Sequence, residues 1–132
     1  MKDAEHEETA PGAPSLIVAR LACSLVGTTE SIHVSPHTIA HRAYGRDDAT
    51  EQFRCNYGLN PHYLPSFSNG PLKVTGTDEA GEVRIVELSN HPFFVATLFL
   101  PQLLSCPGTP HPLVLAYLEA ARAFRDRGGG VA

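Results

Sequence analysis

The sequence predicts an α/β fold, in which a mixed sheet with hairpins packs against one long helix at the carboxyl end. Three segments support this prediction. Apolar side chains recur with the helical period over Pro112–Asp126, and the glycines that follow stop the helix. Residues 78–81 form a glycine-containing connection between two apolar segments, which is typical of a hairpin. Residues 93–100 are apolar on both faces, as in a central strand that is covered on each side.

The amino-terminal third of the chain predicts a tail, two strands and a short helix. Residues 1–14 are acidic and hold few large apolar side chains, so we expect them to form a disordered tail. Residues 16–25 are apolar and partly β-branched and predict a buried strand, and residues 31–34 predict a short strand that returns beside it. Residues 36–44 then predict a short helix that ends at Gly45.

Residues 50–59 predict the most informative strand, because apolar and polar side chains alternate along it. One face would be apolar, with Phe53, Cys55, Tyr57 and Leu59, and the other polar, with Gln52, Arg54, Asn56 and Gly58. Residues 72–77 and 83–88 predict the two strands of the hairpin. The single domain is therefore expected to span residues 15–127, followed by a flexible tail over residues 128–132.

Composition and charge exclude several classes of partner. A formal net charge of -4, without a cluster of Lys and Arg, argues against binding to nucleic acid. No apolar run is long enough for a membrane-spanning helix, and the acidic amino end is unlike a signal peptide. The three cysteines cannot all pair and fit no zinc pattern, so we expect reduced thiols, a cytoplasmic location, and neither a metal nor a cofactor.

Three segments resemble the carboxyl-terminal domain of CTP synthase, a class I glutamine amidotransferase. Residues 55–61, Cys-Asn-Tyr-Gly-Leu-Asn-Pro, resemble its run His-Arg-Tyr-Glu-Val-Asn-Pro. Residues 91–95 match its His-Pro-Phe-Phe-Val, and residues 111–113 match the start of its last helix. The chain resembles still more closely a bacterial group described as related to this region, some of whose members are selenoproteins. That group shares residues 23–27, Cys-Ser-Leu-Val-Gly, and residues 55–61. The resemblance spans residues 21–124 and implies a truncated class I glutamine amidotransferase-like fold.

The departures from this family concern its catalytic groups. The family attacks glutamine with a cysteine in a Gly-x-Cys-x-Gly turn, and the sequence contains no such turn. The His and Glu of the family's Phe-His-Pro-Glu run fall on Leu100 and Gln102. The arginine that holds the carboxylate of glutamine falls on Asn56. The resemblance therefore implies a degenerate amidotransferase-like protein, which on its own has no glutaminase activity.

The resemblance implies a ligand pocket over the polar face of residues 50–59. Arg54 offers a cation with forked donors and Asn56 a donor and an acceptor, so both are predicted to bind the substrate. Leu100 and Gln102 would form the wall at the end of the apolar strand. The alternative is that this polar face is simply solvated.

Three residues are candidates for catalysis in such a pocket. Glu51 lies beside the predicted binding residues and could transfer protons. Cys23 and Cys55 could act as nucleophiles if a neighbouring cation lowered the pKa of either thiol, although buried cysteines are more often small apolar core residues. His111 precedes a proline and is predicted to be a turn residue, not a group for proton transfer.

The sequence leaves two functions open. The first is a small biosynthetic enzyme of secondary metabolism, an isomerase, cyclase or hydrolase that acts on an apolar small molecule. The second is a non-catalytic binding or assembly module that pairs with a partner protein. A truncated sheet leaves strands uncovered, so in either case we expect a homodimer.

Overall fold

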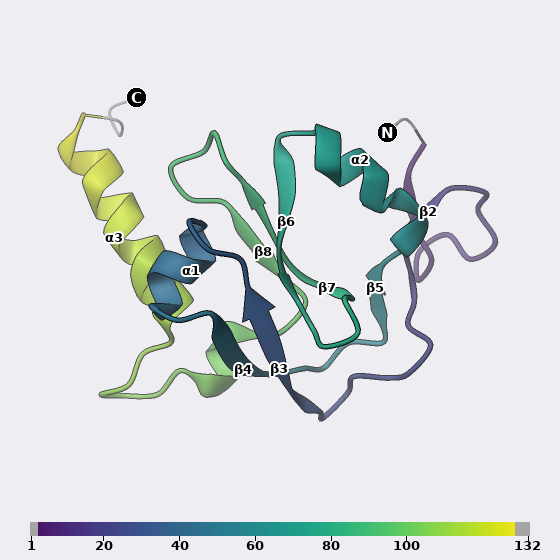
Figure 1. The fold of residues 1–132 in the computed structure, drawn as a ribbon, viewed down its shortest axis with the longest axis horizontal. Coiled ribbons are helices and arrows are strands. Elements are labelled where there is room, and N and C mark those ends of the chain that lie inside the picture. The colour runs from purple at the N-terminus through teal and green to yellow at the C-terminus, as the bar shows by residue number, and fades with distance from the viewer. Residues whose placement is uncertain (1–2, 129–132) are drawn as a thin grey trace.

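The predicted α/β fold is confirmed by a computed structural model, which describes residues 3–128 (Figure 1). A three-stranded sheet has the order β1-β2-β5, with β1 Glu5–His6, β2 Leu16–Arg20 and β5 Tyr57–Leu59. A five-stranded sheet has the order β4-β3-β6-β7-β8, with β4 Asp48–Gln52, β3 Thr29–Val34, β6 Leu72–Thr77, β7 Val83–Leu88 and β8 Val95–Thr97. The helices are α1 Ile39–Tyr44, α2 Leu64–Asn69 and α3 Pro112–Asp126, and the two 3-10 turns are η1 Pro61–Tyr63 and η2 Pro101–Leu104.

The two sheets are continuous through an irregular pair of segments, and this corrects the prediction of one strand over residues 50–59. Residues 53–56 separate β4 from β5, and residues 21–28 separate β2 from β3. Backbone bonds still join the two segments, from Leu25 N to Cys55 O (3.0 Å) and from Gly27 N to Phe53 O (2.9 Å). Residues 21–28 are the longer segment, so they cannot stay in register with residues 53–56. The surplus residues bulge outward.

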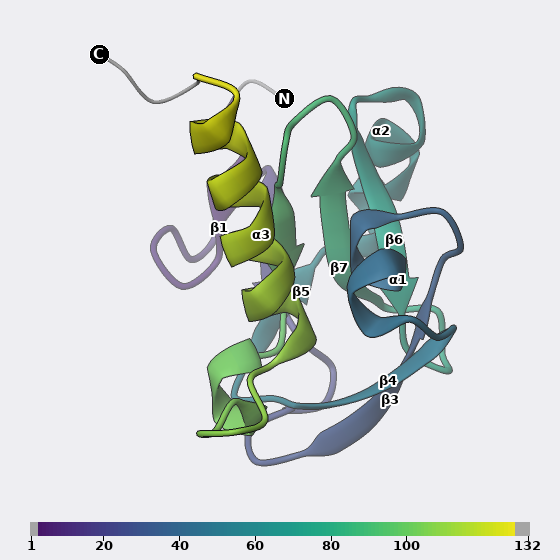
Figure 2. The ribbon, with the colours of Figure 1, turned by 90° about the vertical axis from the view of Figure 1, so that its left-hand side faces the viewer.

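The hydrophobic core lies between the five-stranded sheet, α1 and the start of α3. Phe53 and Phe99 meet edge to face at its centre, with 5.8 Å between ring centroids. Figure 2 shows α3 running along one side of the molecule, and Leu113 in its first turn is buried in the core. Beyond that turn most of the helix is exposed.

Strand β8 was predicted to be central, and the structure corrects this. β8 pairs with β7 alone and ends the order of its sheet. Its apolar run has a different cause: Phe99 enters the core, whereas Phe94 and Ala96 are exposed. Residues 93–100 are therefore apolar on both faces because Phe99 is a core residue and Phe94 and Ala96 are exposed, not because the strand is covered on each side.

The acidic segment predicted to be a tail lies against β2. Glu5 N donates to Ser15 O (2.8 Å) and Glu7 N to Val18 O (3.0 Å), so β1 uses the free backbone edge of β2. Apart from Gly128, the predicted carboxyl-terminal tail lies outside the described residues. Between residues 3 and 128, no helix combines the length and the apolar character that crossing a membrane would require.

Candidate functional site

A cleft of about 470 Å³ opens between the bulged segment 21–25, the end of β5 and the connection from β6 to β7. We call it the hairpin cleft. The polar residues that line it are Arg20, Cys23, Glu30, Asn60, Asp78, Glu82 and Arg84. Its volume lies in the range of small-molecule sites, which combine a concave wall with a few polar groups.

Arg84 is the buried cation of the hairpin cleft, with only 5% of its surface exposed. Its Nη2 donates to Asp78 Oδ2 at 2.6 Å, and its guanidinium lies 5.7 Å from the centre of the Phe53 ring. Its Nε is buried and has no acceptor among residues 3–128. A buried cation is costly unless it is paired, so Asp78 is required for Arg84 to occupy this position.

A β-bulge explains why Arg84 faces inward. Gly76 pairs with Ile85 and Thr77 with Val83, so Arg84 is an extra residue on β7. Side chains of successive strand residues normally point to opposite faces, yet Arg84 and Ile85 are both buried. The bulge therefore turns a charged side chain toward the cleft without removing its apolar neighbour from the core.

Asp78 holds the predicted hairpin connection in shape. Its Oδ1 accepts hydrogen bonds from Ala80 N (3.0 Å) and Glu82 N (2.9 Å). Gly81 has φ 82°, a conformation that favours glycine. The same carboxylate thus fixes the turn through one oxygen and Arg84 through the other.

Of the two thiols predicted to be reactive, Cys23 lines the hairpin cleft and Cys55 does not. Cys23 is exposed on the bulged segment. Cys55 is half-buried, and its Sγ–H donates to Leu98 O at 3.1 Å. The two segments lie side by side, but the structure gives the thiols different surroundings.

The four residues predicted to bind substrate lie apart from the hairpin cleft. Arg54 and Asn56 are exposed on the irregular segment between β4 and β5. Leu100 is half-buried where η2 begins, and Gln102 is exposed within η2. None of them lines the hairpin cleft.

Glu51 belongs to a buried polar cluster instead of the predicted pocket, and only 2% of it is exposed. Its Oε1 accepts hydrogen bonds from Tyr44 Oη (2.6 Å) and from His111 Nε2 (2.7 Å). His111 Nδ1 accepts from Leu113 N, so this nitrogen carries no proton, and Nε2 carries it in a neutral imidazole. Glu51 Oε2 is buried without a partner among the described residues.

The burial of Glu51 follows from the period of the strand. Ala49, Glu51 and Phe53 point to the same, buried side, whereas Arg54 is exposed.

Burial of Tyr44, and then its hydrogen bond to Glu51, raise the pKa of the Tyr44 hydroxyl far above its usual value, so Tyr44 remains a donor. The cluster joins α1, β4 and the start of α3, and sequence reasoning missed both partners of Glu51. The available signal was His111 in front of Pro112, at the position of a helix N-cap.

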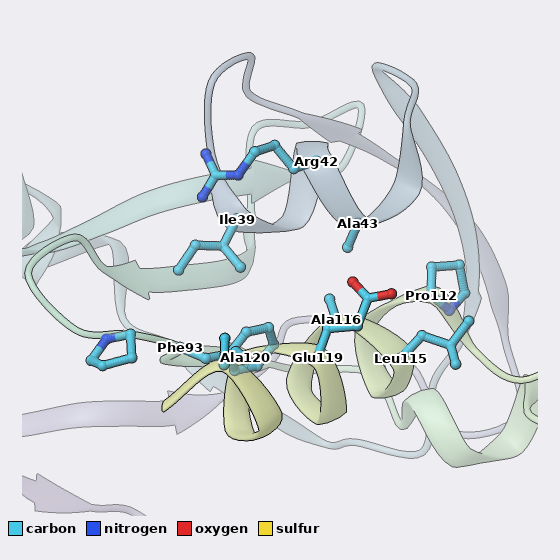
Figure 3. Close-up of a pocket in the computed structure, with 11 residues that line it drawn as sticks. Ile39, Arg42, Ala43, Phe93, Pro112, Leu115, Ala116, Glu119 and Ala120 are labelled. Carbon is cyan, nitrogen blue, oxygen red and sulfur yellow. The ribbon is translucent and has the colours of Figure 1, made fainter. Parts of the chain in front are cut away.

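A larger hollow of about 630 Å³ lies between α1 and α3 (Figure 3). Its walls are mostly apolar, with Ile39, Phe93 and Ala120. Figure 3 shows Arg42 on α1 and Glu119 on α3 as its charged side chains. None of the residues predicted to act in catalysis or binding lines this hollow, and no group of three possible metal ligands occurs among residues 3–128.

Comparison with known proteins finds CTP synthases. The chain is 34% identical to the CTP synthase of Synechococcus sp. (strain CC9902), over 92% of this chain and 24% of that protein. It is 39% identical to the CTP synthase of Flavobacterium psychrophilum, over 72% of this chain and 18% of that protein. The chain thus spans about a quarter or less of the length of these relatives. No family model matches the sequence.

Solved structures with a similar fold include the glutaminase domain of CTP synthase from Trypanosoma brucei with bound acivicin. The TM-score is 0.84 at 24% identity, and the match covers 92% of this chain and 51% of that one. A putative GMP synthase subunit from Thermoplasma acidophilum gives a TM-score of 0.62 at 11% identity, over 84% of this chain and 51% of that one. Both likenesses concern the fold, and in each the chain spans about half of the matched structure.

Proposed function

Because the chain is a relative of the glutaminase domain of CTP synthases and shares its class I amidotransferase fold, we propose that it is a small-molecule enzyme that has lost glutaminase activity. The proposed site is the hairpin cleft, with the thiol of Cys23 as its reactive group. The three free cysteines of the chain support a reducing, cytoplasmic location.

The loss of glutaminase activity is supported by the residues that replace the catalytic groups of the family. Leu100 can neither accept nor donate a proton, and Gln102 carries no charge with which to orient a base. Asn56 is likewise uncharged and cannot pair with the carboxylate of glutamine. These substitutions affect the base, its orienting group and the substrate clamp together.

The observation that carries the proposal is the hairpin cleft itself, in which an exposed thiol and a buried, ion-paired arginine share one concave wall. Of the three predicted catalytic groups, Glu51 is enclosed in its cluster and Cys55 already donates to a carbonyl. Cys23 therefore remains as the group that a ligand can reach. A thiol of this kind suits hydrolysis, isomerisation or cyclisation, as nucleophile or as acid.

The charged groups of the hairpin cleft favour a substrate with polar groups over the expected apolar one. That expectation depended on Leu100 as a wall of the pocket, and Leu100 is not part of the hairpin cleft. Five of the lining side chains are charged instead. We therefore propose a polar substrate.

The test compares two cysteine variants of the full chain. The purified protein should release no ammonia from glutamine above background, and should consume at least one small polar compound from a metabolite extract followed by mass spectrometry. Cys23→Ser should abolish this consumption, whereas Cys106→Ser, a change at an exposed thiol outside the cleft, should preserve it. Equal activity of both variants would remove Cys23 from the proposal, and ammonia release would overturn the lost glutaminase activity.

A second candidate function, an assembly module, is favoured by the exposed apolar surface of α3. Tyr117 and Leu118 are 55% and 56% exposed, and Phe124 is exposed further along the helix. Tyr117 packs edge to face on Phe93 next to β8, an edge strand. Exposed apolar side chains beside an unpaired strand edge are typical of an interface, and we propose a second copy of this chain as the partner.

A further inference from the structure

We propose that Asn69 is a site of spontaneous covalent modification, at which the side-chain amide is lost as ammonia and an aspartyl or isoaspartyl residue forms. The proposal is independent of the proposed function, because the reaction takes place within the chain and requires only water. It depends on three features at the end of α2: an exposed amide, a glycine that follows it, and a backbone N–H of that glycine without a hydrogen bond.

Helix α2 ends at Asn69 because of the two residues that follow it. Pro71 disfavours the helical conformation for the residue before it, and Gly70 is accordingly extended, with φ -92° and ψ 175°. Helix α1 ends differently, since Gly45 has φ 67° and its N–H donates to His41 O. The N–H of Gly70 makes no such capping bond, and no hydrogen bond from it occurs among residues 3–128. A free N–H thus follows directly after an asparagine.

This free N–H is the nucleophile of the proposed reaction. The nitrogen of Gly70 attacks Cγ of Asn69 and forms a bond to it, while the side-chain nitrogen leaves as ammonia and takes the proton of the attacking nitrogen. Water then opens the cyclic imide at either of its carbonyls. Opening at Cγ gives an ordinary aspartate, whereas opening at the main-chain carbon gives isoaspartate, in which the backbone runs through the side chain. In balance, asparagine and water become ammonia and aspartate or isoaspartate.

The surroundings of residues 69–70 offer little resistance to this attack. Gly70 has no Cβ, so no side chain of its own shields the nitrogen. Asn69 is exposed, so the water that opens the imide reaches it from the solvent. As the last residue of a helix without a capping bond, Asn69 can also leave the helical conformation at lower cost than a residue within the helix.

The other asparagines of the chain lack one or more of these features. Asn60 precedes Pro61, which has no N–H. Asn90 is also exposed, but it precedes His91, whose N–H donates to Leu88 O at 3.3 Å. The remaining asparagine precedes a tyrosine, whose side chain shields its nitrogen. Asn90 is therefore the matched internal control, with equal access to solvent and an occupied nucleophile.

The isoaspartyl product would alter the connection between α2 and β6, which follow each other closely in Figure 1. Phe67 of α2 is buried and lines an apolar groove together with Leu72 of β6. Isoaspartate adds one carbon atom to the main chain between these two residues. Both products also add a negative charge at the carboxyl end of the helix, where the helix dipole disfavours it. Lys73 Nζ, which donates to Ser68 O at 2.7 Å, would be attracted to the new carboxylate. We therefore expect the isoaspartyl form to hold α2 less firmly.

Peptide mapping by mass spectrometry tests the site. The full chain would be kept folded at mildly alkaline pH, and the loss of the amide followed at each asparagine. We expect Asn69 to react faster than Asn90 by about tenfold or more. Asn69→Gln should remove the early acidic form of the protein, and Gly70→Ala should slow its formation by about tenfold. Asn90→Gln should leave it unchanged, and circular dichroism checks that each variant is folded.

The same chain unfolded in urea provides the reference for the local sequence alone. If the fold leaves the site open, Asn69 should react in the folded chain within about tenfold of its rate in urea. Equal rates at Asn69 and Asn90, a rate that Gly70→Ala does not change, or much stronger slowing by the fold would each overturn the proposal. In the separated isoaspartyl form, amide hydrogens of residues 64–69 should exchange faster than in the unmodified chain. Unchanged exchange would reject the loosening of α2.

Discussion

The carboxylate of Glu51 illustrates how one residue can hold three elements together. It accepts hydrogen bonds from Tyr44 at the end of α1 and from His111 at the start of α3, and it lies itself on β4. Hydrogen bonds to a charged acceptor in a buried site are among the stronger ones in proteins. We therefore assign the cluster to stability.

Glu51→Ala tests this assignment. The change leaves the Tyr44 hydroxyl and the His111 N–H buried without an acceptor, so the free energy of unfolding in urea should fall by about 2–4 kcal/mol. Glu79→Ala, at an exposed position, should change it by less than about 0.5 kcal/mol. If Glu51→Ala retained full stability and lost only activity, Glu51 would have the catalytic role that its sequence position suggested.

Tyr44 makes stability depend on pH in the alkaline range. The unfolded chain releases the tyrosine proton above about pH 10, whereas burial and Glu51 raise the pKa of Tyr44 in the folded chain, which keeps the proton. This contribution is therefore complete below pH 10 and is lost as pH rises above it, by up to about 1.4 kcal/mol per pH unit. Tyr44→Phe should flatten the fall in unfolding free energy above pH 10. Tyr63→Phe, outside the cluster, is the control, and an equal slope in both variants would contradict the prediction.

At the scale of elements, the hairpin of β6 and β7 carries the cleft because its register is interrupted. The bulge opposite Gly76 directs Arg84 inward, and Asp78 in the turn meets it there. Gly76 permits this close approach, because a Cβ atom at its position would lie 2.6 Å from Ile85 Cγ1.

Gly76→Ala should therefore destabilise the protein. Because Ile85 is fully buried and cannot move aside freely, we expect a loss of about 1–3 kcal/mol in urea unfolding. The same change in an Ile85→Ala background should cost less, since most of the clashing atoms are gone. Additive losses in the double variant would mean that the clash is not the cause.

The whole molecule exposes an apolar surface that a small enzyme does not need for catalysis. That surface includes Tyr117 and Phe124 on α3 and borders β8, one of the two edge strands of the five-stranded sheet. In water such a surface is stabilised by association with a partner.

Light scattering at micromolar concentration should accordingly report about twice the chain mass of 14.2 kDa. Tyr117→Glu and Phe124→Glu should each shift the protein toward the monomer, because a charge would be buried in the interface. Ala123→Glu, with the same added charge on the side of α3 that faces the α1–α3 hollow, should leave the dimer intact. A wild-type monomer, or equal effects of all three variants, would reject this surface as the dimer interface.

Local patterns were sufficient for the elements that depend on local interactions. The period of apolar residues located α3, and the turn chemistry of Asp78 and Gly81 located the hairpin, because both signals arise between residues close in the chain. The relation to the amidotransferase fold was also recoverable from short motifs. These features required no knowledge of which strands meet.

The tertiary structure alone decided the site. Glu51 and His111 are 60 positions apart, and nothing in their spacing indicates that a helix cap would reach back to β4. The hairpin cleft has two causes. Residues 21–28 face the shorter segment 53–56 and bulge beside Arg84, and a second bulge, on β7, turns Arg84 inward. Alternation along one strand predicts which side a residue faces, but register shifts depend on the paired strand. That pairing is a property of the folded chain.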